Sequence, residues 1–396
     1  MARLLVLMAA ALLARPASSS TGSLTLLTQA AAATGAVCLD GSAPGLYTSY
    51  GAELHKVLIF QEGGGWCGPG LNCLQRAATP LGSSTSYPPT MDFSGGYLAD
   101  DAAENPLMHN WTKVYLKYCK CARGRRRTLP SAAASPSPPL PTPCTLPLLP
   151  RAPGDGSSQT SDAAAPAPVG NQTIYYRGHR ILLAFQAHLL ATALAGAAEV
   201  VLAGCSAGGL STYLHADEWR AALPRATRVT ALADRGFFPN FNHTPGGGYG
   251  ALMRQVAVQM NASLAPACLA ANAADPYSCI FAEVAAASLA TPTFALQGKY
   301  DSWQLKGDVD LPTNDTAGVN AWGALVSARL RASLLAAPQH GAFLDSCLHH
   351  CGGFDAFTVD GFTQATAHAA WYAGQARALY NQSEGYPCTA CCSGAV

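Results

Sequence analysis

The sequence has few charged residues and no excess of either sign. Asp, Glu, Lys and Arg make up 12% of its 396 residues, and 24 Lys+Arg stand against 23 Asp+Glu. This charged fraction is about half of what an average soluble domain carries. Such a balance offers neither a basic surface for nucleic acid nor an acidic disordered tail, so we expect no nucleic-acid partner.

Motifs for common cofactors are lacking as well. Neither GxxxxGK[ST] nor GxGxxG with a following acidic residue is present, which argues against a nucleotide-binding loop. Cys388 and Cys391 form a CxxC pair, but no second pair follows at zinc spacing. We therefore expect an activity that needs no cofactor and no metal.

Long apolar runs are also missing beyond the N-terminus. The apolar stretch 181–202 contains Gln186, His188 and Glu199. These polar residues predict a buried helix that leads into a strand, because a membrane span needs about 20 predominantly apolar residues. We expect no membrane association of the mature chain.

Cysteine, in contrast, is abundant, and the N-terminus indicates where the protein resides. A basic start, Met1 to Arg3, precedes the apolar run 4–13 and the small residues 17–20, which together predict a signal peptide over residues 1–20. The 14 cysteines then favour disulfides in a secreted protein. Six N-glycosylation sequons agree with secretion: Asn110, Asn171, Asn242, Asn261, Asn314 and Asn381. The alternative is a cytosolic protein with a hydrophobic first helix and metal-bound cysteines.

Short apolar runs alternate with helical patterns along the rest of the chain. Buried strands are predicted at 57–60, 113–116, 199–203, 228–233 and 293–296, and helices at 176–195, 209–223, 250–260 and 365–379. This alternation predicts an α/β fold, with a mostly parallel central sheet and helices on both faces. We expect one domain over residues 21–396.

One segment does not fit this domain. Residues 120–154 hold a basic cluster followed by alternating Pro, Ser and Ala, a composition that does not build a packed core. We interpret them as a disordered insertion, either a tolerated loop or a retained intron.

The sharpest motif is Gly204-Cys-Ser-Ala-Gly-Gly209, which lies between a strand pattern and a helix pattern. In a nucleophile elbow the flanking glycines let the strand and helix pack closely while the serine, here Ser206, sits at the tip of the turn. The helix start behind it directs N–H groups at an oxyanion. The alternative is a Gly-rich turn whose serine only caps the helix.

A nucleophilic serine needs a base and an orienting acid, which in α/β-hydrolases follow it in the chain. Asp301 comes just after the predicted strand 293–296, and Asp234 after the strand 228–233 is its rival. Four histidines follow Asp301: His340 before a glycine, His349 and His350 between two cysteines, and His368 in a helix pattern that favours a surface position. Spacing alone leaves the choice between His349 and His350 open. Cys347 and Cys351, four residues apart, are expected to hold their loop rigid.

A second glycine-rich segment, Gly63 to Gly65, follows the first convincing strand. Backbone N–H groups in such a place form part of the oxyanion hole of lipases and esterases. Cys67 and Cys73 lie just beyond it and are placed to close a small disulfide loop that fixes Trp66.

Several separated motifs together resemble one family, the pectin acetylesterase and Notum carboxylesterases. These motifs are GGGWC at 63–67, GCSAGG at 204–209, YDSWQ at 300–304 and SCLHHC at 346–351. The resemblance extends from about residue 24 to the mid-350s, and the plant-type pectin acetylesterases look closer because of the glycine and cysteine pattern around His350. One departure is that Tyr118-Cys119 is separated from Asp155-Gly156 by residues 120–154, whereas the family carries a continuous YCDG-type motif.

By motif position, the resemblance implies a Ser-His-Asp triad of Ser206, His350 and Asp301. It places the oxyanion donors at the backbone amides of Gly65, Trp66 and Ala207.

The resemblance also implies that residues 21–396 form a single α/β-hydrolase-like esterase domain. It implies a secreted serine esterase that removes acetyl groups from a pectin-like polysaccharide of the cell wall or extracellular matrix, and we expect this enzyme to be a monomer. Its alternatives are a deacylase of lipid-modified proteins, as in the Notum branch, and a non-catalytic binding protein on the same scaffold.

Overall fold

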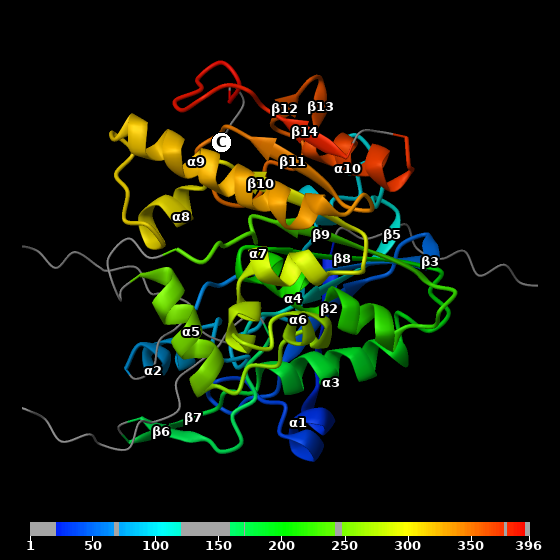
Figure 1. The fold of residues 1–396 in the computed structure, drawn as a ribbon. Helices are drawn as coiled ribbons and strands as arrows, with labels where there is room; N and C mark the ends of the chain where they lie inside the picture. The colour runs from blue at the N-terminus through cyan, green and yellow to red at the C-terminus, as the bar shows by residue number, and fades with distance from the viewer. Residues whose placement is uncertain are drawn as a thin grey trace, which may run out of the picture.

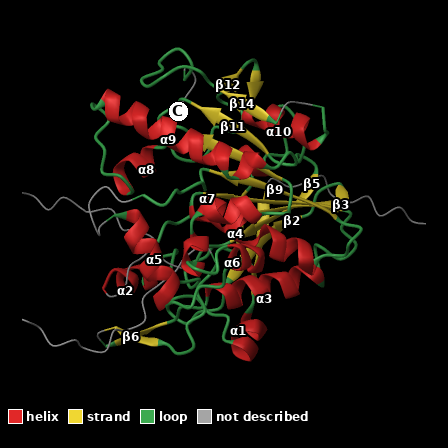
Figure 2. Ribbon diagram, viewed as in Figure 1, coloured by secondary structure: helices red, strands yellow, loops and turns green. Residues whose placement is uncertain are grey.

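The computed structural model describes residues 21–66, 71–119, 159–169, 171–241, 248–375 and 378–392. The expected signal peptide, residues 1–20, and the expected insertion, residues 120–154, lie outside the described residues. Within them, one ten-stranded sheet organises the chain, and Figure 2 shows its strands enclosed by helices.

The sheet has a parallel part and an antiparallel part. Its strand order is β14-β11-β10-β9-β8-β3-β5-β2-β1-β4. The seven strands from β14 to β5 run parallel, and β2, β1 and β4 continue the sheet with antiparallel pairs. The strands are β1 (Thr21–Leu26), β2 (Gly45–Ser49), β3 (Glu53–Gln61), β4 (Thr90–Asp92), β5 (Trp111–Leu116), β8 (Glu199–Cys205), β9 (Arg228–Asp234), β10 (Thr293–Gly298), β11 (Gly341–Asp345) and β14 (Leu379–Asn381). Two short hairpins pair β6 (Ala167–Val169) with β7 (Gln172–Ile174), and β12 (Thr358–Val359) with β13 (Phe362–Thr363).

Helices cover both faces of the sheet. The α-helices are α1 (Thr28–Thr34), α2 (Leu71–Ala77), α3 (Gly178–Leu190), α4 (Ala207–Ala222), α5 (Tyr249–Gln259), α6 (Pro266–Ala271), α7 (Ala282–Ala285), α8 (Ser302–Gly307), α9 (Thr316–Ala332) and α10 (Gln364–Tyr372). Short 3-10 helices lie at η1 (Gly96–Leu98), η2 (Pro276–Ile280), η3 (Ala286–Ser288) and η4 (Leu334–Ala336). Figure 1 shows α3 and α4 beside the middle of the sheet and α10 near the edge strand β14.

The strands alternate their side chains between two hydrophobic cores. Ile59 and Val200 belong to the core that includes apolar residues of α3, α4 and α9. Their neighbours Phe60 and Val201 face the other core, which includes residues of α10 and of the connection that precedes β5. This alternation follows from the two-residue period of a strand and makes both faces of the parallel part apolar.

The predicted fold class is confirmed, and each of the five predicted strands lies within an observed strand. The last predicted helix was wrong at its end, because α10 stops at Tyr372 and Leu379 begins β14. The antiparallel strands β1, β2 and β4 were not predicted. Among the described residues, no helix has the length and apolar character that crossing a membrane requires.

The parallel strands bring the motifs together. Gly63 follows β3, Ser206 follows β8, Asp301 follows β10 and His350 follows β11. Since the carboxyl ends of parallel strands meet at one edge of a sheet, residues far apart in the chain share one site there.

Candidate active site

Ser206 occupies a sharp turn between β8 and α4. Its φ of 58° and ψ of −123° are unusual for a residue with a side chain. A Cβ at Gly208 would lie 2.0 Å from the carbonyl oxygen of Gln61, at the end of β3, and one at Gly204 would lie 2.4 Å from the carbonyl oxygen of Gly208. Only glycine allows so close an approach, so these two positions hold the elbow against the neighbouring strand.

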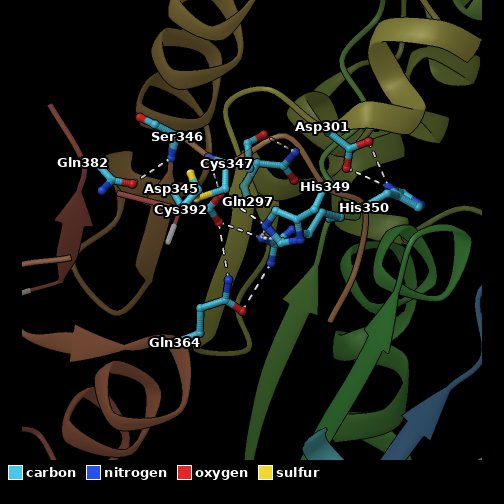
Figure 3. A network of polar contacts seen from close by, with 12 residues as sticks. Gln297, Asp301, Asp345, Ser346, Cys347, His349, His350, Gln364, Gln382 and Cys392 are labelled. Carbon is cyan, nitrogen blue, oxygen red and sulfur yellow. Dashed lines mark hydrogen bonds and ion pairs between the residues drawn. A yellow bond between two sulfur atoms is a disulfide. The ribbon is translucent and has the colours of Figure 1, made fainter. Parts of the chain in front are cut away.

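Asp301 and His350 form a hydrogen-bonded pair at the same edge of the sheet, as Figure 3 shows. Nδ1 of His350 lies 2.9 Å and 2.7 Å from the two carboxylate oxygens of Asp301. The carboxylate is buried and also accepts the amides of Trp303 and Gln304 at 2.9 Å and 3.0 Å, as the N-cap of α8. With the Nδ1 proton directed at Asp301, Nε2 of His350 carries a lone pair and can accept a proton.

The adjacent His349 points elsewhere. Its Nε2 lies against the guanidinium of Arg235 and 3.3 Å from Asp345, and its ring packs on Phe357. His349 and His350 therefore lie in different environments, and His350 is the one that contacts Asp301.

The two remaining candidate histidines are not at this edge. His340 precedes β11, and its Nδ1 accepts the amide of Thr293 at 3.1 Å. The expected surface position of His368 was wrong, because His368 is fully buried in α10 among Phe294 and Trp371. Burial lowers the pKa of His368 to about 3. Neither histidine is placed to serve Ser206.

Asp234, the rival acid, is engaged in an ion pair. Its Oδ1 accepts Nη1 of the buried Arg235 at 2.8 Å, and its Oδ2 accepts the amide of Gly352 at 3.3 Å. Its backbone carbonyl accepts the amide of Ser206 at 2.9 Å. Asp234 thus borders the site without contacting His350 through any hydrogen bond among the described residues.

The glycine-rich segment after β3 lies directly against Ser206. A Cβ at Gly63 would come within 3.0 Å of the Ser206 Cβ. Two side chains orient the next peptides: Nη2 of Arg76 donates to the Gly64 carbonyl at 3.2 Å, and the Tyr118 hydroxyl donates to the Gly65 carbonyl at 2.6 Å.

In a trans peptide the C=O and N–H point in opposite directions. Because the carbonyls of Gly64 and Gly65 are turned toward Arg76 and Tyr118, the amides of Gly65 and Trp66 point away from those side chains. The two amides are held in fixed directions by bonds that the carbonyls make.

Glu62 fixes the start of this segment. Its carboxylate accepts the amide of Tyr118 at 2.6 Å and pairs with Lys117. Burial raises the pKa of Glu62, and the attraction of Lys117 offsets only part of that effect.

A hollow of about 560 Å³ joins these groups. Its lining includes Ser206, His350 and residues 63–65, together with the disulfide-bonded Cys205 and Cys351. Aromatic side chains supply much of the remaining wall: Phe60, Tyr97, Tyr115 and Trp303. The Trp303 ring is also stacked on His350 with the ring centroids 5.9 Å apart.

A disulfide lines this hollow, as expected, but Cys347 and Cys351 are not bonded to each other. Cys347 bonds to Cys392 near the C-terminus, whereas Cys351 bonds to Cys205, the residue just before Ser206. Cys73 is disulfide-bonded, and Cys67 lies outside the described residues. The two cysteines that flank the histidines therefore connect their loop to two different parts of the chain.

Some residues of the site escaped sequence reasoning. Arg76, Tyr118 and Arg235 act through side-chain contacts with segments more than ten residues away, which no local pattern reveals. Cys205 stood inside the serine motif, but its bond to Cys351 depends on proximity in space and could not be read from the sequence.

A serine elbow and an Asp-His pair at one edge of a mostly parallel sheet define the α/β-hydrolase class of proteins. The model of one family, Pectinacetylesterase, matches residues 16–124 and 154–393. The chain therefore belongs to the pectinacetylesterase family, and it is a carboxylic ester hydrolase. Residues 125–153 fall outside the match.

Individual relatives agree with this family. Pectin acetylesterase 11 of Arabidopsis thaliana is 30% identical over 357 residues, covering 84% of this chain and 81% of the relative. Pectin acetylesterase 7 of the same plant is 30% identical over 355 residues with the same coverage of 84% and 81%. The human palmitoleoyl-protein carboxylesterase NOTUM is 28% identical over 220 residues, covering 53% of this chain and 36% of the relative.

Proposed function

We propose that the protein hydrolyses esters through a triad in which Ser206 is the nucleophile, His350 the general base and Asp301 the residue that orients the base. The observation that carries this proposal is the 2.7 Å hydrogen bond between the buried Asp301 and His350, which lines the same hollow as the elbow serine. The amides of Gly65, Trp66 and Ala207 are the proposed oxyanion donors. Anchoring of the Gly64 and Gly65 carbonyls supports the first two, and the position of Ala207 at the start of α4 supports the third.

The reaction follows from these roles. Oγ of Ser206 attacks the ester carbonyl carbon while its proton passes to Nε2 of His350. The tetrahedral oxyanion is held by the amides, and its collapse breaks the bond to the alcohol oxygen, which takes the proton from His350. Water, deprotonated by His350 in turn, then attacks the acyl carbon. Collapse of the second tetrahedral intermediate breaks the bond to Oγ of Ser206, which takes the proton from His350, so the carboxylic acid leaves and the free enzyme is restored.

We further infer that the substrate is an acetyl ester on a pectin-like polysaccharide. The first support is the similarity to two pectin acetylesterases over more than four fifths of their length. The second is the packing behind the glycine-rich segment, where Trp66 meets Phe238, Tyr249 and Trp303 with ring centroids 4.8, 5.3 and 5.4 Å apart. Phe238 and Tyr249 are buried and outside the lining of the hollow, so packed rings close the space behind Trp66 and the hollow does not extend there.

The second candidate function is removal of a longer acyl group, which is the activity that the name of the human enzyme NOTUM describes. It is supported by the similarity to that enzyme over about half of this chain. A series of p-nitrophenyl esters from acetate to palmitate separates the two. We expect kcat/KM to fall as the chain lengthens beyond butyrate. A maximum at eight or more carbons would overturn the acetyl assignment and favour the long-chain one.

The proposed triad is tested with purified protein on p-nitrophenyl acetate and on acetylated pectin, with released acetate measured. Ser206→Ala is expected to lower kcat by about a millionfold. Ser327→Ala, on α9, removes a serine outside the hollow and is expected to keep full activity. Activity of Ser206→Ala within tenfold of the parent would overturn the proposal.

Secretion as a glycosylated monomer is part of the same proposal. It is supported by the N-terminal pattern, the sequons and the disulfides. Expression of the full sequence in a secretory host is expected to yield protein in the medium that begins near residue 21 and loses mass with an N-glycosidase. Retention of residues 1–20 would contradict the signal-peptide prediction.

We infer that residues 120–154 contribute nothing to the catalytic domain, because the family match leaves out most of this segment, residues 125–153. A variant that joins Cys119 directly to Asp155 restores the continuous family motif. We expect it to fold and to hydrolyse p-nitrophenyl acetate as the full chain does. Loss of activity with retained folding would show that the segment takes part in the site.

A further inference from the structure

The histidine loop, residues 346–352, carries the proposed base but belongs to a different strand connection from the serine. It follows β11, whereas Ser206 follows β8, which is separated from β11 by the two strands β10 and β9. The amide of Ser302 donates to the carbonyl of His349 at 3.2 Å, which ties the loop to the segment that carries Asp301. This bond aligns the acid with the base, but it does nothing to align the base with the serine.

One tie between the base and the serine is covalent. Cys205 and Cys351 form a disulfide across a sequence separation of 146 residues. Cys205 is bonded directly to Ser206 in the chain, and Cys351 directly to His350. The cross-link therefore joins the neighbours of the two residues between which the proton must move.

A second tie is ionic and lies beside the disulfide. The Asp234 carboxylate is within 4.8 Å of both sulfurs of that disulfide. Asp234 holds the Ser206 amide with its backbone carbonyl at 2.9 Å and the Gly352 amide with its side chain at 3.3 Å. One residue thus bonds to the serine turn and to the histidine loop at once.

The buried guanidinium of Arg235 connects Asp234 with Asp345, the residue just before the histidine loop. Its Nη1 donates to Asp234 at 2.8 Å and its Nη2 donates to Asp345 at 2.6 Å. Asp345 in turn accepts the amide of Cys347 at 3.1 Å. Figure 3 shows Asp345 and His349 in this network, with Gln364 beneath them.

Arg235 serves both carboxylates of this network. Burial would raise the pKa of Asp345, but the attraction of Arg235, the contact with His349 and the hydrogen bond from the Cys347 amide together outweigh burial and keep the pKa below its ordinary value. Arg235 is fully buried and lies between two carboxylates, so each carboxylate retains a partner. The network is therefore a buried, hydrogen-bonded support beneath the histidine loop.

We propose that Asp234, Arg235, Cys205 and Cys351 are positioning residues, which hold the histidine loop at a fixed place relative to the serine turn. This inference rests on the proposed function, since it assigns Ser206 and His350 the roles of nucleophile and base. The disulfide and the Asp234 contacts fix the position of His350 relative to Ser206, and neither takes part in the Asp301–His350 hydrogen bond. Displacement of a reacting group by about 1 Å can cost about 100-fold in rate.

The disulfide is tested with the double variant Cys205→Ala/Cys351→Ala. The matched control is Cys268→Ala/Cys279→Ala, which removes another buried disulfide whose residues do not line the hollow. Hydrolysis of p-nitrophenyl acetate gives kcat and KM, and titration of active serines with a fluorophosphonate gives the fraction of competent enzyme. Normalising kcat to that fraction separates slower enzyme from misfolded enzyme.

We expect kcat per titrated serine to fall by about 100-fold for Cys205→Ala/Cys351→Ala with little change in KM. The control pair is expected to lose stability but to keep kcat per titrated serine.

Asp234→Asn tests the ionic tie without the risk that removing Arg235 leaves two buried carboxylates unpaired. It is expected to lower kcat per titrated serine by about tenfold. Asp275→Asn, which breaks the exposed Arg254–Asp275 pair, is its control and is expected to be neutral.

The outcomes distinguish the two proposals. If Ser206→Ala is inactive while both the disulfide and Asp234 variants keep the parent kcat per titrated serine, the positioning role is wrong and the triad stands. If Ser206→Ala is active, the proposed function itself fails. A fall in kcat for both tie variants, absent from both controls, supports the positioning role.

Discussion

Asp301 makes two sets of hydrogen bonds, and substitutions can separate the stabilising effect of one from the proposed catalytic effect of the other. The carboxylate caps α8 through the amides of Trp303 and Gln304, both of which donate to Oδ1, and it contacts Nδ1 of His350 through both oxygens. Asn caps a helix about as well as Asp, whereas Ala gives up about 1 kcal/mol. Asp301→Asn should therefore keep most of the free energy of unfolding, and Asp301→Ala should lose about 1 kcal/mol more than Asn.

The catalytic cost follows from the same geometry. If the Asn oxygen keeps the two helix amides, its NH₂ group takes the place of Oδ2, which lies 2.7 Å from Nδ1 of His350. That group donates to Nδ1 and forces the ring proton onto Nε2, where a lone pair is needed to accept the serine proton. By analogy with the serine-protease triad, kcat should fall by about 10⁴, or about 5 kcal/mol of transition-state free energy.

The assay pairs urea unfolding with hydrolysis of p-nitrophenyl acetate for the parent, Asp301→Asn and Asp301→Ala. Both variants are expected to lose about the same kcat but to differ in stability. Asp301→Asn with kcat within tenfold of the parent would refute the orienting role. Equal stability losses in the two variants would refute the capping role.

Three further predictions concern other parts of the molecule. Tyr118→Phe removes the hydroxyl that donates to the Gly65 carbonyl, and we expect it to lower kcat by about tenfold with KM nearly unchanged in steady-state kinetics. An unchanged kcat would mean that this hydrogen bond does not position the amide of Trp66. Gly208→Ala places a Cβ 2.0 Å from the Gln61 carbonyl oxygen and should cost about 2 kcal/mol or more in urea unfolding, whereas a parent-like midpoint would contradict the close packing. His368 has a pKa of about 3 in the folded protein and about 6.5 in the unfolded chain. Between these pH values the unfolded state binds one more proton than the folded state. The free energy of unfolding therefore falls as the pH drops from about 6.5 to about 3. The expected loss is about 2 kcal/mol at pH 5, and His368→Leu should remove it; equal pH dependence of the two proteins in urea unfolding would show that His368 does not titrate in this way.

The sequence was most informative where local patterns carry the constraint. The parallel strands appeared as short apolar runs, because a strand buried on both faces needs apolar residues at every position. Ser206 was recognisable because its turn requires glycines at fixed offsets, and Gly204 and Gly208 do approach the backbone as such a turn requires.

Local patterns were least informative where the decisive partner lies far along the chain. His368 looked like a surface residue because the helix pattern around it is rich in alanine, which does not mark one face as the buried one. His349 and His350 are equivalent in spacing, and their different directions depend on Arg235 and Asp301, which belong to other strand connections. Disulfide pairing likewise depends on three-dimensional proximity, so Cys351 gave no sign of its bond to Cys205.

The central claim is that Ser206 is the nucleophile, and covalent labelling tests it most directly. Purified protein is treated with a fluorophosphonate, digested with trypsin and analysed by peptide mass spectrometry, in parallel with hydrolysis of p-nitrophenyl acetate. We predict one modified residue, Ser206, with loss of activity in proportion to labelling and no labelling in His350→Ala on the same time scale. Full inactivation with the label on another residue, or stoichiometric labelling of Ser206 without loss of activity, would contradict the account.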